Sequence, residues 1–454
     1  MQERESKQIS RRLFMKSTAA AMGAFTIVPS RVLGGPGHTP PSDTVYVAAI
    51  GVGGRGSSDI HSADNAGAKI VALCDVDEQR AVGAYKKYPE AHKYKDFRKL
   101  LDKEKNIDAV IVATPDHTHA VATMTAMERG KHVFCEKPLA HSLYETRKIT
   151  EAARKYKVAT QLGNQGRSSE HIRLFCEWIW DGAIGQVHQV HAMCRKSKFY
   201  SDRVSKIDET HKVPETFDWD LWLGPMPYRK YNPMYLPKTW RGWRQFGDGI
   251  IGDWACHIID PVFWALDLGA PKTILAEVEN YDPKKYFETF PGKPKITYEF
   301  PAKAGRGPVE VIWYGGGLKP PRPKDLEEGR AFPSEKNIGA LVVGEKGKIM
   351  YGSHGADSCR IIPESKMKEY KLPPKTIPRS PGHIEEWLTA CKGGHPAGSN
   401  FDYGGPLTEI ALLGALATIM PGTKLEWDAD TLTFPNCPEA DQYINWQYRK
   451  GWSL

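Results

Sequence analysis

The chain has 454 residues, of which 41% are hydrophobic and 26% are charged, and its formal net charge is +8 at pH 7. Half of this positive excess lies in residues 1–33, which hold six Lys or Arg against two Glu, and both signs of charge are interspersed in the rest. This composition predicts a globular chain of two or more domains. It excludes nucleic acid as a partner, because a concentrated basic surface is missing.

The first residues follow the order of a signal peptide, which is basic, then apolar, then small. Arg11, Arg12 and Lys16 precede the alanine-rich apolar stretch 17–28, which is shorter than the roughly 20 residues that span a bilayer. The adjacent arginines resemble a twin-arginine signal, an address for export in the folded state. We expect residues 1–42 to be such a signal peptide and linker, the twin-arginine export machinery to be a partner, and the protein to be periplasmic. The alternative is a basic N-terminal arm.

The eight cysteines are scattered along the chain, without a Cys-x-x-Cys pair, and several fall in apolar runs. Buried free thiols are therefore the expected state. An oxidising compartment permits disulfides, but a protein that folds before export closes its cores in a reducing environment. We expect few or no disulfides.

After a Pro/Gly-rich linker, strand and helix patterns alternate, which is typical of a doubly wound parallel sheet. Helical spacing covers residues 118–129. The expected parallel strands are residues 45–50, 69–74, 109–113, 132–135 and 159–163.

From residue 187 onward the pattern changes to longer alternating stretches, which are typical of an antiparallel sheet. These stretches are residues 187–194, 273–279, 296–300 and 309–314. The predicted fold is α/β, with an N-terminal Rossmann dinucleotide-binding domain and a C-terminal α/β domain that has a large open, mostly antiparallel sheet. The expected boundaries are 43–168 for the Rossmann domain, 169–430 for the substrate-binding domain and 431–454 for a C-terminal arm.

The first predicted strand leads into a loop with glycines at its first, third and sixth positions, the dinucleotide fingerprint. The first glycine makes the tight turn, the second admits the diphosphate, and the third lets the next helix pack closely. The loop residues expected to bind the cofactor are Gly51, Gly53, Arg55 and Gly56. Asp75, 19 residues past the last glycine, is placed to bind the ribose hydroxyls. A carboxylate there disfavours a 2′-phosphate and predicts NAD, while the nearby Arg80 leaves NADP open.

Three further motifs follow in order along the chain. Residues 114–119 read Thr-Pro-Asp-His-Thr-His, residues 136–138 read Glu-Lys-Pro, and Asp253 precedes His257 by four positions. Together with the glycine loop, these motifs resemble the Gfo/Idh/MocA oxidoreductase family over about residues 43–430. The resemblance implies a Rossmann domain followed by an α/β domain with an open sheet, acting on sugars, cyclitols or their derivatives.

The resemblance also assigns cofactor-binding residues. It places Thr114, Pro115, His117 and His119 near the nicotinamide ribose, and Glu136 and Lys137 beside the ring. Asn164 and Gln165, after the fifth predicted strand, complete the set. For the two histidines, capping of the helix that follows is the alternative.

The chemistry of alcohol oxidation needs a base for the hydroxyl proton and a cation for the oxygen. Asp253 and His257 are four residues apart, so on a helix they share one face. We assign His257 as the general acid/base and Lys137 as the group that stabilises the developing negative charge, while Asp253 orients His257 or binds an adjacent hydroxyl. The alternatives are a structural Asp/His pair and a turn-capping lysine. A metal held with Asp260 lacks a fourth ligand, so no metal is expected.

The substrate-binding segment is expected between residues 196 and 248, where aromatic residues are frequent. Two interpretations stay open, a carbohydrate pocket and a small core or subunit interface. The aromatic residues are Phe217, Trp219, Trp222, Tyr228, Tyr231, Tyr235, Trp240, Trp243 and Phe246, interleaved with Lys238, Arg241 and Arg244. The predicted substrate contacts are Lys137, Arg167, Trp240, Arg244, Asp253 and His257.

These features predict an exported NAD-dependent oxidoreductase that acts on a hydroxyl of a sugar, glycoside or cyclitol. Outside the inner membrane little free NAD is expected, so the cofactor would be held tightly and recycled within the site. One alternative is an NAD-dependent glycosidase that works by transient oxidation, elimination and re-reduction. Another is a non-catalytic sugar-binding protein with structural NAD. The resemblance also implies a homo-oligomer, dimer or tetramer, since the uncovered face of the open sheet in the family typically pairs with another subunit.

Overall fold

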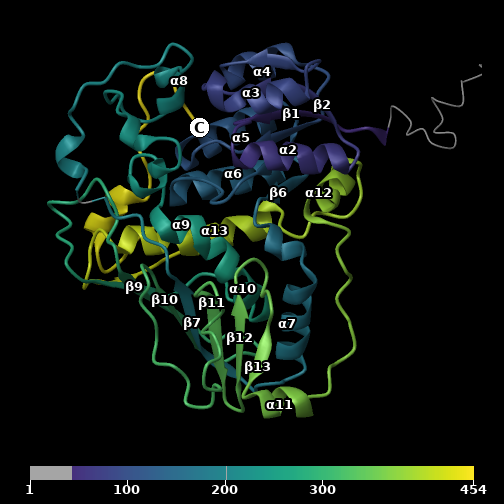
Figure 1. Cartoon of the computed structure of the whole chain (residues 1–454), viewed down its shortest axis with the longest axis vertical. Helices are drawn as coiled ribbons and strands as arrows, with labels where there is room; N and C mark the ends of the chain where they lie inside the picture. Colours follow the sequence, from purple (N-terminus) through teal and green to yellow (C-terminus); the bar gives the residue numbers. More distant parts are fainter. Residues whose placement is uncertain (1–42, 201) are drawn as a thin grey trace, which may run out of the picture. The chain divides into compact units, whose positions relative to one another are not determined.

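A computed structural model of the chain describes residues 43–200 and 202–454. Residues Val45–Leu454 form one compact unit, in which one sheet with its helices lies beside a second, larger sheet (Figure 1). The signal peptide expected at residues 1–42 lies outside the described residues.

The first sheet is parallel, with six strands in the order β3-β2-β1-β4-β5-β6. Its strands are β1 (Tyr46–Ile50), β2 (Lys69–Cys74), β3 (His92–Tyr94), β4 (Ala109–Val112), β5 (His132–Cys135) and β6 (Thr160–Leu162). Its helices are α2 (Arg55–Asn65), α3 (Glu78–Lys87), α4 (Phe97–Lys103), α5 (His119–Glu128) and α6 (Leu143–Tyr156). The predicted Rossmann domain is confirmed. Strand order reverses between β1 and β4, and such a switch point is where doubly wound sheets bind ligands.

Five of these six strands match the predicted apolar runs, because a parallel sheet covered on both faces buries continuous runs. β3 was not predicted, since it is a polar edge strand with the sequence His-Lys-Tyr. One face of the sheet is covered in part by α12 (His383–Cys391), whose Ile384, Trp387 and Leu388 pack into the same core as β1. The chain therefore returns to the Rossmann domain from within the segment assigned to the substrate-binding domain.

The second sheet has eight strands in the order β13-β12-β11-β7-β10-β9-β8-β14. Only β7 and β10 pair in parallel, so the expected mostly antiparallel sheet is confirmed. The strands are β7 (Val187–Cys194), β8 (Thr273–Val278), β9 (Pro294–Phe300), β10 (Val309–Tyr314), β11 (Ile338–Gly344), β12 (Lys348–Gly352), β13 (Arg360–Ile362) and β14 (Lys424–Glu426). The last four were not predicted.

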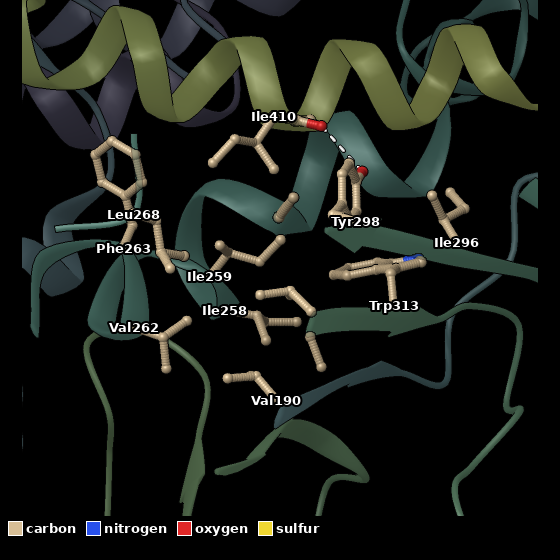
Figure 2. Packing of buried hydrophobic residues seen from close by; sticks show 14 of the residues in the cluster. Val190, Ile258, Ile259, Val262, Phe263, Leu268, Ile296, Tyr298, Trp313 and Ile410 are labelled. Carbon is tan, nitrogen blue, oxygen red and sulfur yellow. Dashed lines mark hydrogen bonds between the residues drawn. The ribbon is translucent and has the colours of Figure 1, made fainter. Parts of the chain in front are cut away.

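Helices cover one face of this sheet and enclose the largest core. They are α7 (Glu170–Trp180), α9 (Gly249–Ile258), α10 (Asp260–Ala265) and α13 (Phe401–Ala417), while the short helices α8 (Trp219–Leu223) and α11 (Glu364–Glu369) lie elsewhere. Figure 2 shows Val190 of β7 below Ile258 of α9, and Trp313 of β10 to the side of Ile258 and below Tyr298. The hydroxyl of Tyr298 donates a hydrogen bond of 2.9 Å to the carbonyl of Ile410, which ties the sheet to α13 (Figure 2).

The C-terminal arm packs on the chain's own nucleotide domain. Trp446 stacks on His141 with ring centroids 5.2 Å apart, and the Tyr448 hydroxyl donates a hydrogen bond to Glu145 of α6. Trp452 contacts Phe97 at the start of α4. This contact fixes the end of the chain beside the first domain.

All eight cysteines are free thiols, and six of them are buried. Burial raises the pKa of Cys256, for example, to about 12, so these thiols are poor nucleophiles. Within residues 43–200 and 202–454, we find no helix with the length and apolar character that crossing a bilayer would need.

Candidate active site

A cavity of about 670 Å³ lies at the carboxyl ends of β1, β2 and β4. The glycine loop, Asp75 and Thr114 line it on the side of the nucleotide domain. Lys198, Arg241 and Asp253 are among the residues that line it from the second domain. The cavity thus sits at the switch point of the parallel sheet and between the two domains.

The three fingerprint glycines are required by close backbone approach. A Cβ atom on Gly51 (φ 82°) would lie 2.7 Å from the carbonyl carbon of Ala113, and one on Gly56 would lie 1.9 Å from the carbonyl oxygen of Gly51. At Gly53 the nearest atom is the Cβ of Arg80, at 3.0 Å. The loop, α2 and β4 therefore come closer together than side chains permit.

The start of α2 offers a site for the diphosphate of a dinucleotide. Gly54 is its N-cap, no side chain bonds its first amides, and its first turn holds no acidic residue. Uncapped helix amides of this kind bind anions. The loop and this helix end thus fit a dinucleotide.

Asp75 lies next to the glycine loop, as the ribose-binding prediction requires. Its Oδ2 accepts hydrogen bonds from the amides of Val52 at 2.9 Å and Gly53 at 3.1 Å, and it lines the cavity. Burial raises the pKa of Asp75 above its ordinary value, although those amide bonds oppose the change. Arg80 lines the same end of the cavity. The residues present fit NAD, which would be held by the glycine loop, the α2 amides and Asp75.

Behind the loop, Glu136 binds two polar side chains. Its Oε1 accepts hydrogen bonds from Arg55 at 3.1 Å and from Gln165 at 2.7 Å. Arg55 also pairs with the buried Asp59 at 2.6 Å. Burial, and then the charge of Glu136, raise the pKa of Asp59 well above its ordinary value. The structure therefore brings together Arg55, Glu136 and Gln165, three predicted cofactor residues.

Lys137 and Asp253 form an ion pair between the two domains. The Lys137 ammonium donates to the Asp253 carboxylate at 2.8 Å and to its backbone carbonyl at 2.7 Å, and Arg241 donates to the same carboxylate oxygen at 3.0 Å. Burial alone would raise the pKa of Asp253, but the two cations hold it well below its ordinary value. Burial lowers the pKa of Lys137, but the charges of Asp253 and Glu136 raise it more, so the pKa lies above its ordinary value. Both groups are charged at neutral pH.

His257 lies one helical turn after Asp253 on α9, as the spacing predicts. Its ring is buried, and its Nδ1 has no hydrogen-bond partner among the described residues. Burial, and then Lys137 and His354, lower the pKa of His257 well below its ordinary value. The imidazole is therefore neutral at pH 7. A buried nitrogen without a partner marks a place where a ligand can bind.

His354, in the turn after β12, is a site residue that was not predicted from the sequence. Its ring stacks on that of His257 with centroids 4.2 Å apart and an interplanar angle of 29°, and its φ of 61° is left-handed. The turn is held against the segment after β6, since a Cβ on Gly166 would lie 2.3 Å from the His354 carbonyl carbon. Its position directly before Gly355 was a weak signal for such a bend.

Seven predicted cofactor residues are not among those that line the cavity, namely Gly56, His117, His119, Glu136, Lys137, Asn164 and Gln165. Both histidines and Asn164 are held by other groups of the protein. The ring nitrogens of His117 face the carbonyl oxygens of Trp222 at 2.8 Å and Phe246 at 3.2 Å, and burial lowers the pKa of His117 to about 3. The nitrogens of His119 face two other carbonyls at 2.7 and 2.9 Å. The side-chain amide of Asn164 donates a hydrogen bond to Asp260 and accepts one from Ser399. Neither histidine side chain caps a helix.

Of the six predicted substrate contacts, Trp240 and Asp253 line the cavity, while Lys137, His257, Arg167 and Arg244 are not among its lining residues. Arg167 donates to the carbonyl of Gly398, and its guanidinium lies 3.2 Å from the ring centroid of Trp264. Arg244 is buried over Phe290 and donates to groups near the end of α13. Neither residue lines the cavity, because both guanidinium groups are enclosed by aromatic rings and backbone carbonyls.

The aromatic segment forms a small core, as one of the two interpretations predicts, and the carbohydrate pocket stays a prediction. Most of its rings form a separate core, for example Trp219 stacked on Trp222 with centroids 4.8 Å apart. Trp222 and Trp240 also line the cavity.

Asp260, a candidate metal ligand by sequence, is hydrogen-bonded to Asn164 and Tyr403. The described part of the chain contains no cluster of His, Cys, Asp or Glu suited to a metal.

The fold and the site define a two-domain dinucleotide-binding protein of the oxidoreductase type. The family described as "Oxidoreductase family, NAD-binding Rossmann fold" matches residues 45–164, and its "C-terminal alpha/beta domain" matches residues 186–304. Together these segments make up more than half of the chain. The chain belongs to this Gfo/Idh/MocA oxidoreductase family, and its cofactor is NAD.

Among curated relatives, inositol 2-dehydrogenase of Salmonella typhimurium is 33% identical over 203 residues, which cover 43% of this chain and 59% of that protein. Levoglucosan dehydrogenase of Pseudarthrobacter phenanthrenivorans is 25% identical over 42% of this chain and 40% of its own length. A glycosyl hydrolase family 109 protein of Shewanella pealeana is 33% identical over 32% of this chain and 37% of its own length. The chain thus spans less than two thirds of each of these relatives.

Solved structures share the fold at low sequence identity. An inositol dehydrogenase homolog from Azotobacter vinelandii, complexed with NADH and myo-inositol, matches with a TM-score of 0.55 at 16% identity, over 85% of this chain and 98% of that one. Aldose-aldose oxidoreductase from Caulobacter crescentus, complexed with glycerol, matches with a TM-score of 0.53 at 18% identity, over 84% and 99%. These likenesses support the two-domain fold.

Proposed function

We propose that the protein oxidises a hydroxyl-bearing carbon of a sugar, glycoside or cyclitol, using NAD that stays bound and is regenerated within the site when its reduced form transfers the hydride to another carbonyl group of a sugar. The observation that carries this proposal is that Asp253, which lines the same cavity as the glycine loop, is bonded to Lys137 and lies one helical turn from His257. The relatives named as inositol 2-dehydrogenase and levoglucosan dehydrogenase support this class of substrate.

The unused hydrogen-bonding capacity of the site matches a hydroxyl. An ammonium group has three N–H donors, and Lys137 directs two of them to Asp253, which leaves one. The Nδ1 of His257 has no partner among residues 43–200 and 202–454. A hydroxyl both donates and accepts hydrogen bonds, so it can pair with the two groups together.

Each residue then has a defined task. His257 is neutral and takes the hydroxyl proton. Lys137 stabilises the negative charge that develops on the oxygen, and Asp253 fixes the ammonium in place. When bound, NAD supplies the acceptor for the carbon-bound hydrogen and its electron pair.

The test is to purify the protein, identify the copurifying nucleotide by mass, and add candidate sugars, glycosides and inositols while recording the absorbance of reduced nicotinamide. Exchange of the substrate's carbon-bound hydrogen, followed by isotope labelling, detects turnover when the cofactor is recycled. Lys137→Met is expected to lower the rate by about 10²- to 10³-fold, whereas Lys148→Met, an exposed residue of α6, leaves it unchanged. If no candidate is oxidised and none exchanges hydrogen, the protein is a sugar-binding protein instead.

A second candidate function is an NAD-dependent glycosidase, which is favoured by the similarity to the glycosyl hydrolase family 109 protein. In that reaction the transient ketone acidifies the neighbouring C–H bond, the glycosidic bond is eliminated, water adds back, and the ketone is reduced again. Release of the aglycone without net formation of reduced cofactor distinguishes it from a dehydrogenase.

Export by the twin-arginine machinery to the periplasm is part of the proposal. It is supported by Arg11 and Arg12 ahead of the apolar stretch 17–28. Replacing both arginines by lysine should keep the protein in the cytoplasmic fraction, and equal export of both forms would refute it. A homo-oligomer is also proposed, and light scattering of the purified protein measures its mass.

A further inference from the structure

Four basic side chains line the part of the cavity that the second domain provides. Lys196 and Lys198 follow the end of β7, and Lys238 and Arg241 come from the turn that precedes α9. The only carboxylate that lines this part of the cavity, within the described residues, is Asp253. The net charge of this part of the cavity is therefore strongly positive.

This positive charge is not neutralised by the protein. Asp253 already accepts hydrogen bonds from Arg241 and from Lys137. Across residues 43–200 and 202–454, Lys198 and Lys238 have neither a hydrogen-bond partner nor an ion-pair partner for their ammonium groups. The Lys196 ammonium lies 4.0 Å from the ring centroid of Trp254, which attracts a cation but does not cancel its charge.

The four cations are close enough to affect one another. Lys198 is half-buried, and burial lowers its pKa, with Arg241, Lys196 and Lys238 lowering it further against the opposing effect of Asp253. Like charges held together at a partly desolvated surface repel, and an anion placed among them removes that repulsion. The arrangement is therefore better suited to an occupied site than to an empty one.

The cofactor does not account for these cations. Its diphosphate fits the glycine loop and the free amides of α2, on the opposite wall of the cavity. On the wall of the nucleotide domain, Arg55 pairs with Asp59 and Glu136, Lys95 pairs with Glu78, and Arg80 lines the cavity together with Asp75 and Asp77. The unbalanced charge is thus confined to the substrate side.

We propose that the substrate is an anionic sugar, with a carboxylate, phosphate or sulfate group that binds among Lys196, Lys198, Lys238 and Arg241 while its reacting hydroxyl lies at Lys137 and His257. This inference rests on the proposed function, because it takes the same cavity as the substrate site. Trp240, which packs against Arg241 with its ring centroid 4.1 Å from the guanidinium, supplies an apolar surface for the sugar ring.

The test is a calorimetric binding titration of the NAD-loaded protein with three matched pairs of ligands. These are glucuronate and its neutral methyl ester, glucose 6-phosphate and glucose, and glucose 6-sulfate and glucose. At least one acid is expected to bind about tenfold or more tightly than its neutral partner, since hydrogen bonds to a charged group each contribute about that factor. The pair with the largest ratio identifies the oxyanion.

The variants Lys198→Gln and Lys238→Gln should each reduce the ratio between acid and neutral ligand about tenfold, while affinity for the neutral ligand is kept. Lys392→Gln, an exposed residue beyond α12, is the matched control and should leave the ratio unchanged. Equal affinity for acid and neutral ligand in all three pairs would overturn the inference. Turnover of neutral sugars in that case would leave the proposed function intact, whereas tight binding of an acid without oxidation of any sugar would refute the proposed function alone.

Discussion

Gly56→Ala offers a sharp test of the glycine loop, because the structure defines what the added methyl group would meet. Its Cβ would lie 1.9 Å from the carbonyl oxygen of Gly51, 3.0 Å from the carbonyl carbon of the same residue and 3.1 Å from the Cβ of Ala113. A carbon and an oxygen atom are normally more than about 3 Å apart, so α2 and the loop would have to separate by more than about 1 Å. Overpacking of this kind costs typically about 1–3 kcal/mol.

The same substitution at Gly83 is the matched control. Gly83 lies in α3, also a helix of the nucleotide domain, and a Cβ there meets no atom within 4 Å. Because alanine is the better helix former, Gly83→Ala should stabilise the protein by about 0.5–1 kcal/mol. The two variants therefore differ in the sign of their effect although the chemical change is identical.

Urea unfolding measures both free energies, and titration of the purified variants with NAD measures cofactor affinity. In Gly56→Ala, displacement of the loop should weaken NAD binding by about tenfold or more, because the amides of the loop would no longer lie beside the start of α2. Gly83→Ala should bind NAD like the parent protein. Equal stability and equal NAD affinity of the two variants would refute the close approach of loop and helix.

Three further predictions concern titratable side chains. His354→Ala should lower sugar oxidation about ten- to a hundredfold by freeing the ring of His257, while His354→Phe keeps the stacked ring and most of kcat. Burial lowers the pKa of His141, but Asp248, 3.1 Å away, raises it to about 9. The pair should therefore contribute about 3 kcal/mol of stability below pH 6.5, and this contribution should be lost as the pH rises to about 9. The Tm of the parent protein should fall over that pH range, and the Tm of Asp248→Asn should not. The hydrogen-bonded Arg379 lowers the pKa of Glu177 to about 2. The stability that this ion pair contributes should be lost as the pH falls from about 4.5 to about 2. In urea unfolding, Glu177→Gln should be less stable than the parent protein at pH 7, and its stability should lack that acid-range decrease.

Motifs that are contiguous in sequence could be predicted, because a single local structure brings their residues together. The glycine loop is one turn between a strand and a helix, and Asp253 and His257 share one turn of α9. Lys137 was predicted from a three-residue motif at the end of β5. For these residues the sequence contains the local geometry that matters.

Residues brought together only by tertiary structure could not be found in this way. His354 follows β12 and meets His257 across almost one hundred residues of chain, and Lys198 follows β7. At Arg244 the sequence predicts a substrate contact, but the guanidinium does not line the cavity and is buried between the Phe290 ring, the carbonyl of Ala415 and the hydroxyl of Thr418. Sequence records that a residue is charged, but not which surface it faces.

The ion pair between Lys137 and Asp253 shows why neither domain can form the site alone. Lys137 is carried by the nucleotide domain, directly after β5, and Asp253 by α9 of the second domain. Both side chains are mostly buried, with exposed fractions of 11% and 18%, and a buried charge without its partner is costly. Separation of the domains would break this pair, leaving Asp253 with Arg241 but Lys137 without the Asp253 carboxylate, so the pair favours the arrangement in which the ammonium, the imidazole of His257 and the cavity are adjacent. The same pair leaves the neighbouring lysines without a carboxylate of their own, which is the physical reason that an anionic ligand suits the second wall.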